Sequence, residues 1–506
     1  MMFKKKQKKT TLNITKNPDE KDISTAAKSL NEQTLRELFK KNEDVKFEHF
    51  TFNQHKVLFT YCQGLVKNDM LYQTVPERLE AFFSQLQVEP SKEKILELLR
   101  LPSLKLVGNE DEAVSEIFSG KLLLIFNIPG SIFLVDISER PQRNPEETKT
   151  EVSLLGPRDN FIEDISINTA LIRKRLRTTS LASKSLEIGR RTRTKVSVLF
   201  IDDITDKEIL QTIMEKLSAI DIDGLFSGTQ LEELIDKNPF GFFPRHAYTG
   251  RPDFAVQSLL NGRIIILIDG IAYAYITPVN LFFLLKSTED KEQNYAFNSF
   301  ERLMRVVGIL VATFLPGFWV ALSAFHQNQL PLTLLATIVE SRRGVPLPTA
   351  LEALLMLLIF ELFREAGLRL PTAVGQTLSV IGGLIIGDAA IRAGLTNPAM
   401  LVVISGSTIA TFTLVNQWLI GTVSIIRFFV IFCVSLFGFF GFFISIYIIL
   451  IYIAQIRIFG VPYLGLATRI DMMNILKSVF RLPDSKKGNR ANSLNPNDPT
   501  RKEGKS

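Results

Sequence analysis

The stretch VVGILVATFLPGFWVALSAFH, Val306–His326, contains no Asp, Glu, Lys or Arg. A helix of about 20 apolar residues is long enough to cross the hydrocarbon core of a bilayer. The stretch therefore predicts a membrane span. Further uncharged stretches follow it and predict three more full spans: Leu370–Gly387, Ala399–Ile420 and Phe428–Ile456.

Two apolar segments depart from a simple span. At about 1.5 Å per residue, Phe428–Ile456 exceeds a core of ~30 Å, so it predicts a tilted or protruding helix unless Gly438 and Gly441 bend it. The block Leu351–Phe363 is shorter and carries two glutamates. We interpret this block as a partial, re-entrant or bundle-buried segment.

The composition fits a protein that lies partly in water and partly in lipid. Its 506 residues are 46% hydrophobic and 22% charged, with a net charge of +7. Only two cysteines occur, which excludes a disulfide framework and a thiolate metal site, and the four histidines are scattered. No metalloprotease helix motif and no phosphate-binding Gly-Lys-Ser/Thr loop is present in the sequence. We therefore predict no enzymatic activity, no catalytic residue, no metal and no cofactor.

The N-terminal half contains an imperfect repeat. FSGKLLLIFN, Phe118–Asn127, matches LNGRIIILID, Leu260–Asp269, because a polar-Gly-basic turn leads into an apolar strand in both. A turn and a second β-prone run follow each copy, and VSVLFI, Val196–Ile201, is a strand that opens the second copy. The repeat predicts two related α/β subdomains. Between them, Gly156–Leu181 has helical periodicity and predicts a helical bridge.

These patterns predict an α/β cytoplasmic domain of two similar subdomains joined by helices, followed by an all-α multi-pass membrane domain. The start of the chain is basic and no apolar run follows it, and the tail is also basic, so we expect both termini in the cytoplasm. The predicted order is a basic disordered N-terminus (1–30), a first soluble subdomain with the helical bridge (31–195), a second soluble subdomain (196–300), a membrane domain of four full spans plus one partial segment (301–458) and a disordered basic tail (459–506).

Two stretches of the apolar half carry a family resemblance. They are SRRGVPLPTALEALLMLLIFELFREAGLRLP, Ser341–Pro371, and GQTLSVIGGLIIGDAAIRAGL, Gly375–Leu395. GPRDNFIEDISINTALIRKRL, from Gly156, and the Arg251-Pro252-Asp253 step support them. In these stretches the chain resembles the spore germination receptor A-subunit family, the GerA group, over residues 100 to 465.

The resemblance implies a multi-pass protein of the spore inner membrane that assembles with a transporter-like B subunit and a lipoprotein C subunit into a nutrient sensor. It implies that the nutrient binds mainly to the B subunit, and that the A subunit oligomerises to form a ligand-gated cation channel that triggers germination. Two alternatives stay open: a secondary transporter of the nutrient, and a non-conducting scaffold subunit of the receptor.

Small and polar residues near the end of the second predicted span are candidates for pore lining or gating. The set is Gln376, Ser379, Gly383, Gly387 and Asp388. An ionisable group inside a membrane is a functional candidate, because its burial in lipid is costly. Asp388 also stands where the family resemblance leads us to expect an uncharged polar residue such as Gln. The alternatives are helix packing through the small-xxx-small pair and an ion pair of Asp388 with Arg392, four residues later.

Charged residues form two further candidate groups. Glu361 with Arg364 and Glu365 with Arg369 have helical ion-pair spacings, which favour a structural network over a gating role. A basic cluster could contact anionic lipid headgroups or acidic surfaces of neighbouring subunits; its residues are Arg173, Lys174, Arg175, Arg177, Arg190, Arg191 and Arg193. Nucleic-acid binding is disfavoured, because no zinc-finger spacing, recognition helix or aromatic RNA-binding signature accompanies the cluster.

Overall fold

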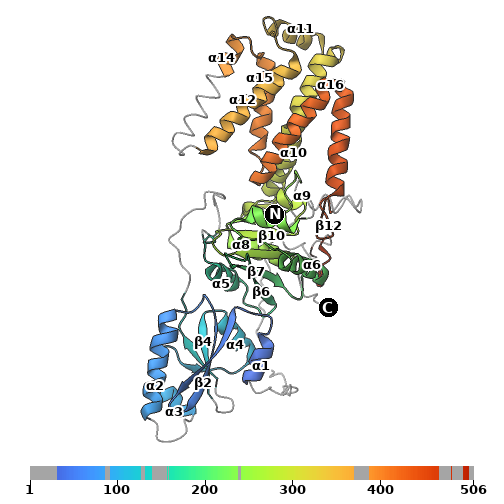
Figure 1. Cartoon of the computed structure of the whole chain (residues 1–506). Helices are drawn as coiled ribbons and strands as arrows, with labels where there is room; N and C mark the ends of the chain where they lie inside the picture. Colours follow the sequence, from blue (N-terminus) through green and yellow to red (C-terminus); the bar gives the residue numbers. More distant parts are fainter. Residues whose placement is uncertain are drawn as a thin grey trace, which may run out of the picture.

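The computed structural model describes residues 31–85, 92–126, 132–139, 157, 159–236, 241–369, 387–465, 480, 490 and 494–500. Figure 1 shows an elongated molecule, with two α/β subdomains toward one end and a bundle of long helices at the other.

The first subdomain is built on a five-stranded antiparallel sheet of order β1-β2-β4-β5-β3. Its strands are β1 (Val45–Phe52), β2 (His55–Cys62), β3 (Lys105–Leu106), β4 (Lys121–Phe126) and β5 (Ile132–Asp136). Its helical segments are α1 (Glu32–Leu38), η1 (Met70–Thr74), α2 (Val75–Gln85), α3 (Lys92–Leu98) and α4 (Glu110–Ile117). Because side chains alternate along a strand, Leu122 and Leu124 enter one hydrophobic cluster and Leu123 enters another, on the opposite face.

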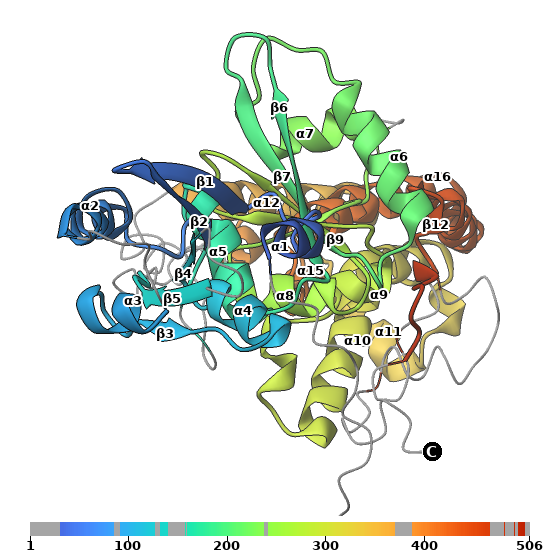
Figure 2. The same cartoon turned by 90° about the horizontal axis from the view of Figure 1, so that it is seen from below.

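The second subdomain has a sheet of order β6-β7-β9-β10-β8, also antiparallel. Its strands are β6 (Leu181–Ile188), β7 (Thr194–Ile201), β8 (Ala247–Thr249), β9 (Ile264–Ile268) and β10 (Ala274–Thr277). Its helical segments are α5 (Ile165–Arg175), α6 (Lys207–Ser218), α7 (Gly228–Ile235), α8 (Pro252–Leu259), α9 (Leu281–Leu284) and η2 (Thr288–Lys291). Figure 2, seen from the α/β end, shows β6 and β7 as a long hairpin beside α6 and α7. One face of this sheet shares a continuous hydrophobic cluster with the helical half.

The two sheets have the same strand order when β1 to β5 are matched in turn with β6 to β10. The repeated segments are β4 and β9, and each follows a helix, α4 or α8, as the repeat predicted. The glycines of the two turns, Gly120 and Gly262, have φ of +92° and +86°, a region open mainly to glycine. One detail is wrong: β7 does not open the second copy, because β6 precedes it in the same sheet.

Among the described residues, the helical half contains two helical segments that are long and apolar enough to cross a membrane: Tyr295–Phe325, which joins α10 (Tyr295–Val320) to η3 (Ala321–Phe325), and α16 (Gln417–Gln455). The other helical segments described there are η4 (Gln327–Gln329), α11 (Leu332–Ser341), α12 (Thr349–Arg369), α14 (Gly387–Arg392) and α15 (Pro398–Thr411), and a small hairpin, β11 (Arg457–Ile458) with β12 (Val461–Pro462), follows α16. The predicted span Val306–His326 thus falls almost wholly in the first long segment.

The helix α16 folds back on itself at Gly438, whose φ of +57° and ψ of −136° are not helical. A Cβ on Gly441 would lie 2.1 Å from the carbonyl oxygen of Cys433, which shows how tightly the chain turns. Thr422 and Tyr452 both bond to the backbone of Phe242, although a straight helix would place them roughly 45 Å apart. The two glycines therefore bend the segment Phe428–Ile456. This is the second of the two alternatives that the sequence left open, the first being a straight, tilted or protruding helix. Figure 1 shows the two arms of this hairpin, before and after Gly438.

Two other predicted apolar segments differ from the structure. Ala399–Ile420 is not one span, because α15 ends at Thr411 and Asn416 begins a new helix by accepting hydrogen bonds from the backbone N–H of Trp418 and Leu419. The block Leu351–Phe363, which the sequence predicted as a partial segment, lies within the longer helix α12 of 21 residues. The predicted span Leu370–Gly387 lies outside the described residues, except for its last residue.

Part of the predicted disordered tail is ordered. Tyr463 is fully buried and its hydroxyl donates to the carbonyl oxygen of Pro244 at 2.9 Å. Further along, Leu494 is buried in the core of the second subdomain, and the backbone N–H of Asn497 donates to the carbonyl oxygen of Ile204 at 3.0 Å. The prediction of disorder is wrong for these residues, because Tyr463 and Leu494 are buried against the second subdomain and Asn497 hydrogen-bonds to its backbone.

A buried arginine joins the two subdomains. Arg173, on α5, is fully buried, and its Nε and Nη2 donate to the two carboxylate oxygens of Asp44 at 2.8 and 2.7 Å. Its Nη1 donates to the carbonyl oxygen of Leu181 at 2.7 Å, and its guanidinium lies 4.4 Å from the ring centre of Phe118. Asp44 and Phe118 belong to the first subdomain, while Leu181 begins β6. The pair of Arg173 and Asp44 therefore fixes the position of one subdomain relative to the other.

We predict that Arg173→Ala lowers the free energy of unfolding by about 3–5 kcal/mol, because it leaves the Asp44 carboxylate buried without its charged partner. Thermal or denaturant unfolding of the full chain in detergent measures this. The matched control is Arg177→Ala, four residues further along the chain and exposed, which should change stability by less than about 0.5 kcal/mol. Equal effects of the two substitutions would contradict the structural role.

Candidate functional site

A polar cluster is buried inside the helical half, between α12, α15 and the first arm of α16. Arg427 is 1% exposed; its Nη2 lies 3.0 Å from Glu361 Oε1, and its Nη1 donates to Ser407 Oγ at 2.9 Å. The Ser407 hydroxyl donates in turn to the carbonyl oxygen of Ala312, on α10, at 3.0 Å. The Arg427 guanidinium thus joins α16 to α12 and α15, and Ser407 links this contact to α10.

Arg364 extends this cluster at its edge. It pairs with Glu361 three residues before it, and its Nη1 donates to Ser424 Oγ at 2.8 Å, while Ser424 also accepts from Arg427. Among the described residues the cluster holds two guanidiniums and one carboxylate, and Arg427 Nε has no hydrogen-bond partner there. Burying such charged groups among apolar helices costs free energy. The cluster is therefore a candidate functional site.

A second buried carboxylate, near the start of α12, binds the residues that directly precede α15. Glu352 is fully buried, and its Oε1 accepts hydrogen bonds from Thr396 Oγ1 at 2.9 Å and from the backbone and side-chain nitrogens of Asn397, both at 2.7 Å. Asn397 also caps α15 by accepting from the backbone N–H of Met400. Glu352 and the Arg427 cluster therefore hold α12 against α15 and α16 at two levels.

The predicted ion pairs both form, with different surroundings. Glu361 and Arg364 belong to the buried cluster, whereas Glu365 and Arg369 are 59% and 80% exposed and bound only to each other among the contacts described. Spacing along one helix found these pairs. It missed Arg427, Ser407 and Ser424, which lie on other helices. One sequence signal could have found this cluster: Arg427 is a single charged residue between two long uncharged stretches.

The candidate pore residues are placed only in part. Gln376, Ser379 and Gly383 lie outside the described residues. Gly387 is buried, and a Cβ there would lie 3.2 Å from a methyl of Leu401 on α15. Asp388 is 59% exposed and pairs with Arg392 at 2.8 Å, as the plainer alternative had it.

The residues of the basic cluster do not form one surface. For Arg173 the prediction of a lipid or subunit contact is wrong, because its side chain is fully buried against Asp44. Arg175 pairs with Asp159 at 2.6 Å, and four further arginines are exposed on the β6–β7 turn or near α5. The positions are as follows: Arg177 is exposed, Lys174 is partly exposed, Arg190 pairs with Asp221, Arg191 lies 3.8 Å from Asp223, and Arg193 is exposed in the turn.

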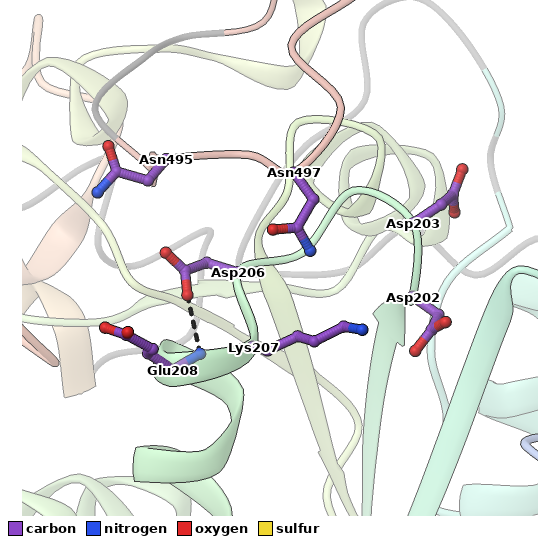
Figure 3. Close-up of a pocket in the computed structure, with 7 residues that line it drawn as sticks. All are labelled: Asp202, Asp203, Asp206, Lys207, Glu208, Asn495 and Asn497. Carbon is purple, nitrogen blue, oxygen red and sulfur yellow. Dashed lines mark hydrogen bonds between the residues drawn. The ribbon is translucent and has the colours of Figure 1, made fainter.

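A surface pocket at the start of α6 gathers acidic and amide side chains (Figure 3); it is lined by Asp202, Asp203, Asp206, Lys207, Glu208, Asn495 and Asn497. Asp206 caps α6 by accepting from the backbone N–H of Glu208 at 2.8 Å, the bond that Figure 3 draws. Asp202 pairs with Lys41 of the first subdomain at 2.5 Å. The acids therefore serve as a helix cap and a subdomain contact, and they give no catalytic constellation.

Taken together, the described residues form a duplicated α/β unit and a bundle of apolar helices that holds a buried arginine cluster and two segments long and apolar enough to cross a membrane. A family model described as Bacillus/Clostridium GerA spore germination protein matches residues 33–493. The chain belongs to this family of spore germination receptor A subunits.

Individual relatives agree with the family match. The chain is 41% identical over 481 residues to spore germination protein XA of Bacillus anthracis, covering 93% of this chain and 97% of that protein. It is 33% identical over 462 residues to spore germination protein B1 of Bacillus subtilis, covering 90% and 94%. It is 31% identical over 425 residues to a B. subtilis protein described as the uncharacterized membrane protein YfkQ, covering 83% and 82%. These names are not those of enzymes, which fits the predicted non-enzymatic role.

A solved structure also matches: the N-terminal domain of the A subunit of the Bacillus megaterium spore germinant receptor GerK3. The identity is 27%, the TM-score is 0.37, and the match covers 49% of this chain and 92% of that one.

We predict that Glu361→Gln and Arg427→Gln each lower the thermal midpoint of the chain in detergent, because each leaves a buried group of the cluster without its charged partner. The double variant should lose less stability than the sum of the single variants, with a coupling of about 0.5–3 kcal/mol. The matched control is the same cycle on Glu365 and Arg369, whose exposed pair should couple by only about 0.3–0.5 kcal/mol. Additive effects at Glu361 and Arg427 would show that the contact carries no energy.

Proposed function

We propose that this chain is the A subunit of a nutrient-sensing germinant receptor in the spore inner membrane, and that several copies form a ligand-gated cation channel. In this proposal it assembles with a transporter-like B subunit and a lipoprotein C subunit, and it converts nutrient binding by a partner into ion release. Membership of the germination receptor A-subunit family supports the receptor role. The channel, the oligomer and the named partners are the further steps.

The observation that carries the proposal is the contrast between the outside and the inside of the helical half. Large apolar side chains are strongly exposed on several of its helices, among them Leu332, Val402, Ile409, Phe440 and Tyr447 at 65–83%. Such a surface needs lipid or other protein chains to cover it. Inside, the Arg427 cluster ties four helices together, so that a movement of one is transmitted to the others. Lipid, further copies and partner subunits can share the exposed surface.

We also propose that the helical half crosses the membrane several times and that the α/β subdomains lie in the cytoplasm. The two arms of α16 support an even number of membrane crossings by that segment, since residues near both of its ends contact Phe242 of the second subdomain. The excess of basic residues in the chain supports the cytoplasmic placement.

The pore assignment is tested with Asp388→Asn and Gly387→Leu. We expect Asp388→Asn to reduce cation conductance severalfold, because it removes an exposed carboxylate that attracts cations, and Gly387→Leu to disturb the contact with α15. The measurement is nutrient-dependent current after reconstitution with the partner subunits, or potassium efflux from spores. Glu365→Gln serves as the control, since it removes an exposed, paired carboxylate of α12.

Three outcomes separate the proposal from its rivals. Unchanged conductance and nutrient response in both variants would remove the pore assignment. Uptake of labelled nutrient by this subunit alone would favour a transporter. A monomer that binds the partners without any conductance would favour a scaffold.

A further inference from the structure

Three potential metal ligands meet where the second α/β subdomain contacts α16. Glu232 lies on α7, Asp236 directly follows that helix, and His246 lies just before β8. One oxygen of each carboxylate and one imidazole nitrogen lie within 4.8 Å of one another. The geometry thus offers two oxygens and one nitrogen to a single point.

His246 is the unusual member of this cluster. Its side chain is 2% exposed, and its Nε2 has no hydrogen-bond partner among the described residues. The nearest carboxylate oxygen, Asp236 Oδ1, is 3.9 Å away, which is too far for a hydrogen bond. A buried polar nitrogen left without a partner destabilises the folded chain. A neutral imidazole whose nitrogen has no partner can offer its lone pair to a metal ion.

The two carboxylates are only partly compensated by their neighbours. Burial raises the pKa of both Glu232 and Asp236. The guanidinium of Arg245 lies 3.4 Å from Asp236 Oδ2, which is long for a charge-assisted bond, and the charge of Lys216 also acts on Asp236. Glu232 accepts from the hydroxyl of Tyr248 and from the backbone N–H of Arg245 at 3.3 Å. A cation at this point would supply the missing positive charge.

We propose that Glu232, Asp236 and His246 bind a divalent transition-metal cation of the zinc type. Imidazole nitrogen with carboxylate oxygens is a donor set that suits zinc and cobalt, and three protein ligands leave a fourth position for water. At metal–ligand distances of about 2.0–2.2 Å, tetrahedral ligand atoms lie roughly 3.4 Å apart. The side chains therefore have to close by about one ångström on binding, which a few small χ rotations provide.

The location gives the site a consequence for the helices. Glu232 and Asp236 line a cavity of about 150 Å³ that Trp418 and Thr422 of α16 also line. The segment that ends in His246 also carries Phe242, whose backbone N–H donates to the Tyr452 hydroxyl at 3.1 Å and whose carbonyl oxygen accepts from the Thr422 hydroxyl at 2.5 Å. A metal that fixes His246 relative to α7 would therefore fix the segment that holds both arms of α16.

The test uses the full chain, without a histidine tag, in detergent and stripped of metal by a chelator. Titration with Co²⁺ should give one equivalent of bound metal with visible d–d bands, and X-ray absorption at the metal edge should report one nitrogen ligand of imidazole type. Zn²⁺ should compete for the same site. Asp236→Asn, Glu232→Gln and His246→Gln should each weaken binding about tenfold or more, because each removes a ligand.

Two features keep the result decisive. Asp236→Asn and Glu232→Gln keep the size and shape of the side chains that they replace, so both variants should fold without metal, which circular dichroism and the thermal midpoint check. Asp203→Asn is the matched control, since it removes an exposed acid in the other acidic cluster and should leave the affinity unchanged. Absence of a saturable cobalt site in the unmutated chain, or affinity unchanged in both folded acid variants, overturns the proposal.

Discussion

The reversal of α16 at Gly438 determines the arrangement of the helical half. A left-handed φ at this position is open to glycine at little cost, whereas any side chain would meet both its own backbone and the ring of Phe325, which lies 3.0 Å from a Cβ built there. Because the chain turns back, the second arm returns to the α/β end, where Tyr452 reaches Phe242 and Tyr463 reaches Pro244. Without the turn, the residues after the first arm would be carried away from the second subdomain, and the core that it shares with the helices would be open on one side.

The two halves of the molecule use the same device to join elements that are distant in sequence. In the α/β half, Arg173 binds Asp44 across a separation of 129 residues. In the helical half, Arg427 binds Glu361 across 66 residues. A guanidinium can bond several acceptors in fixed directions, so it specifies one arrangement of its neighbours more narrowly than apolar contacts do. A buried pair of this kind adds little net stability over apolar packing, yet its loss is expensive, which makes it a determinant of arrangement.

The same distinction explains what could be predicted from the sequence. The repeat around β4 and β9, the first apolar helix and the pairs Glu361–Arg364 and Glu365–Arg369 follow from local patterns, because strand alternation and helical spacing are local. The contacts of Arg427 with Ser407 and of Arg173 with Asp44 depend on how the elements pack, which spacing does not encode. The break between α15 and α16 was missed because every residue from Ala399 to Ile420 is uncharged, and hydropathy outweighed the capping signal of Asn416.

Communication between the α/β half and the helices has a short physical route in this structure. The segment from Gly241 to His246 ends beside Glu232 and Asp236, packs its Phe243 ring against Tyr452 and Tyr463, and bonds both arms of α16 through Phe242. A change in the second subdomain that displaces this segment must therefore either break these bonds or move the arms with it. The first arm carries Arg427, so its movement changes the contacts that α12 and α15 make with that guanidinium, and Ser407 passes the change on to Ala312 of α10. The two oxygens of the single Glu361 carboxylate bind both guanidiniums, so a shift of either arginine changes the charge balance that the other one meets.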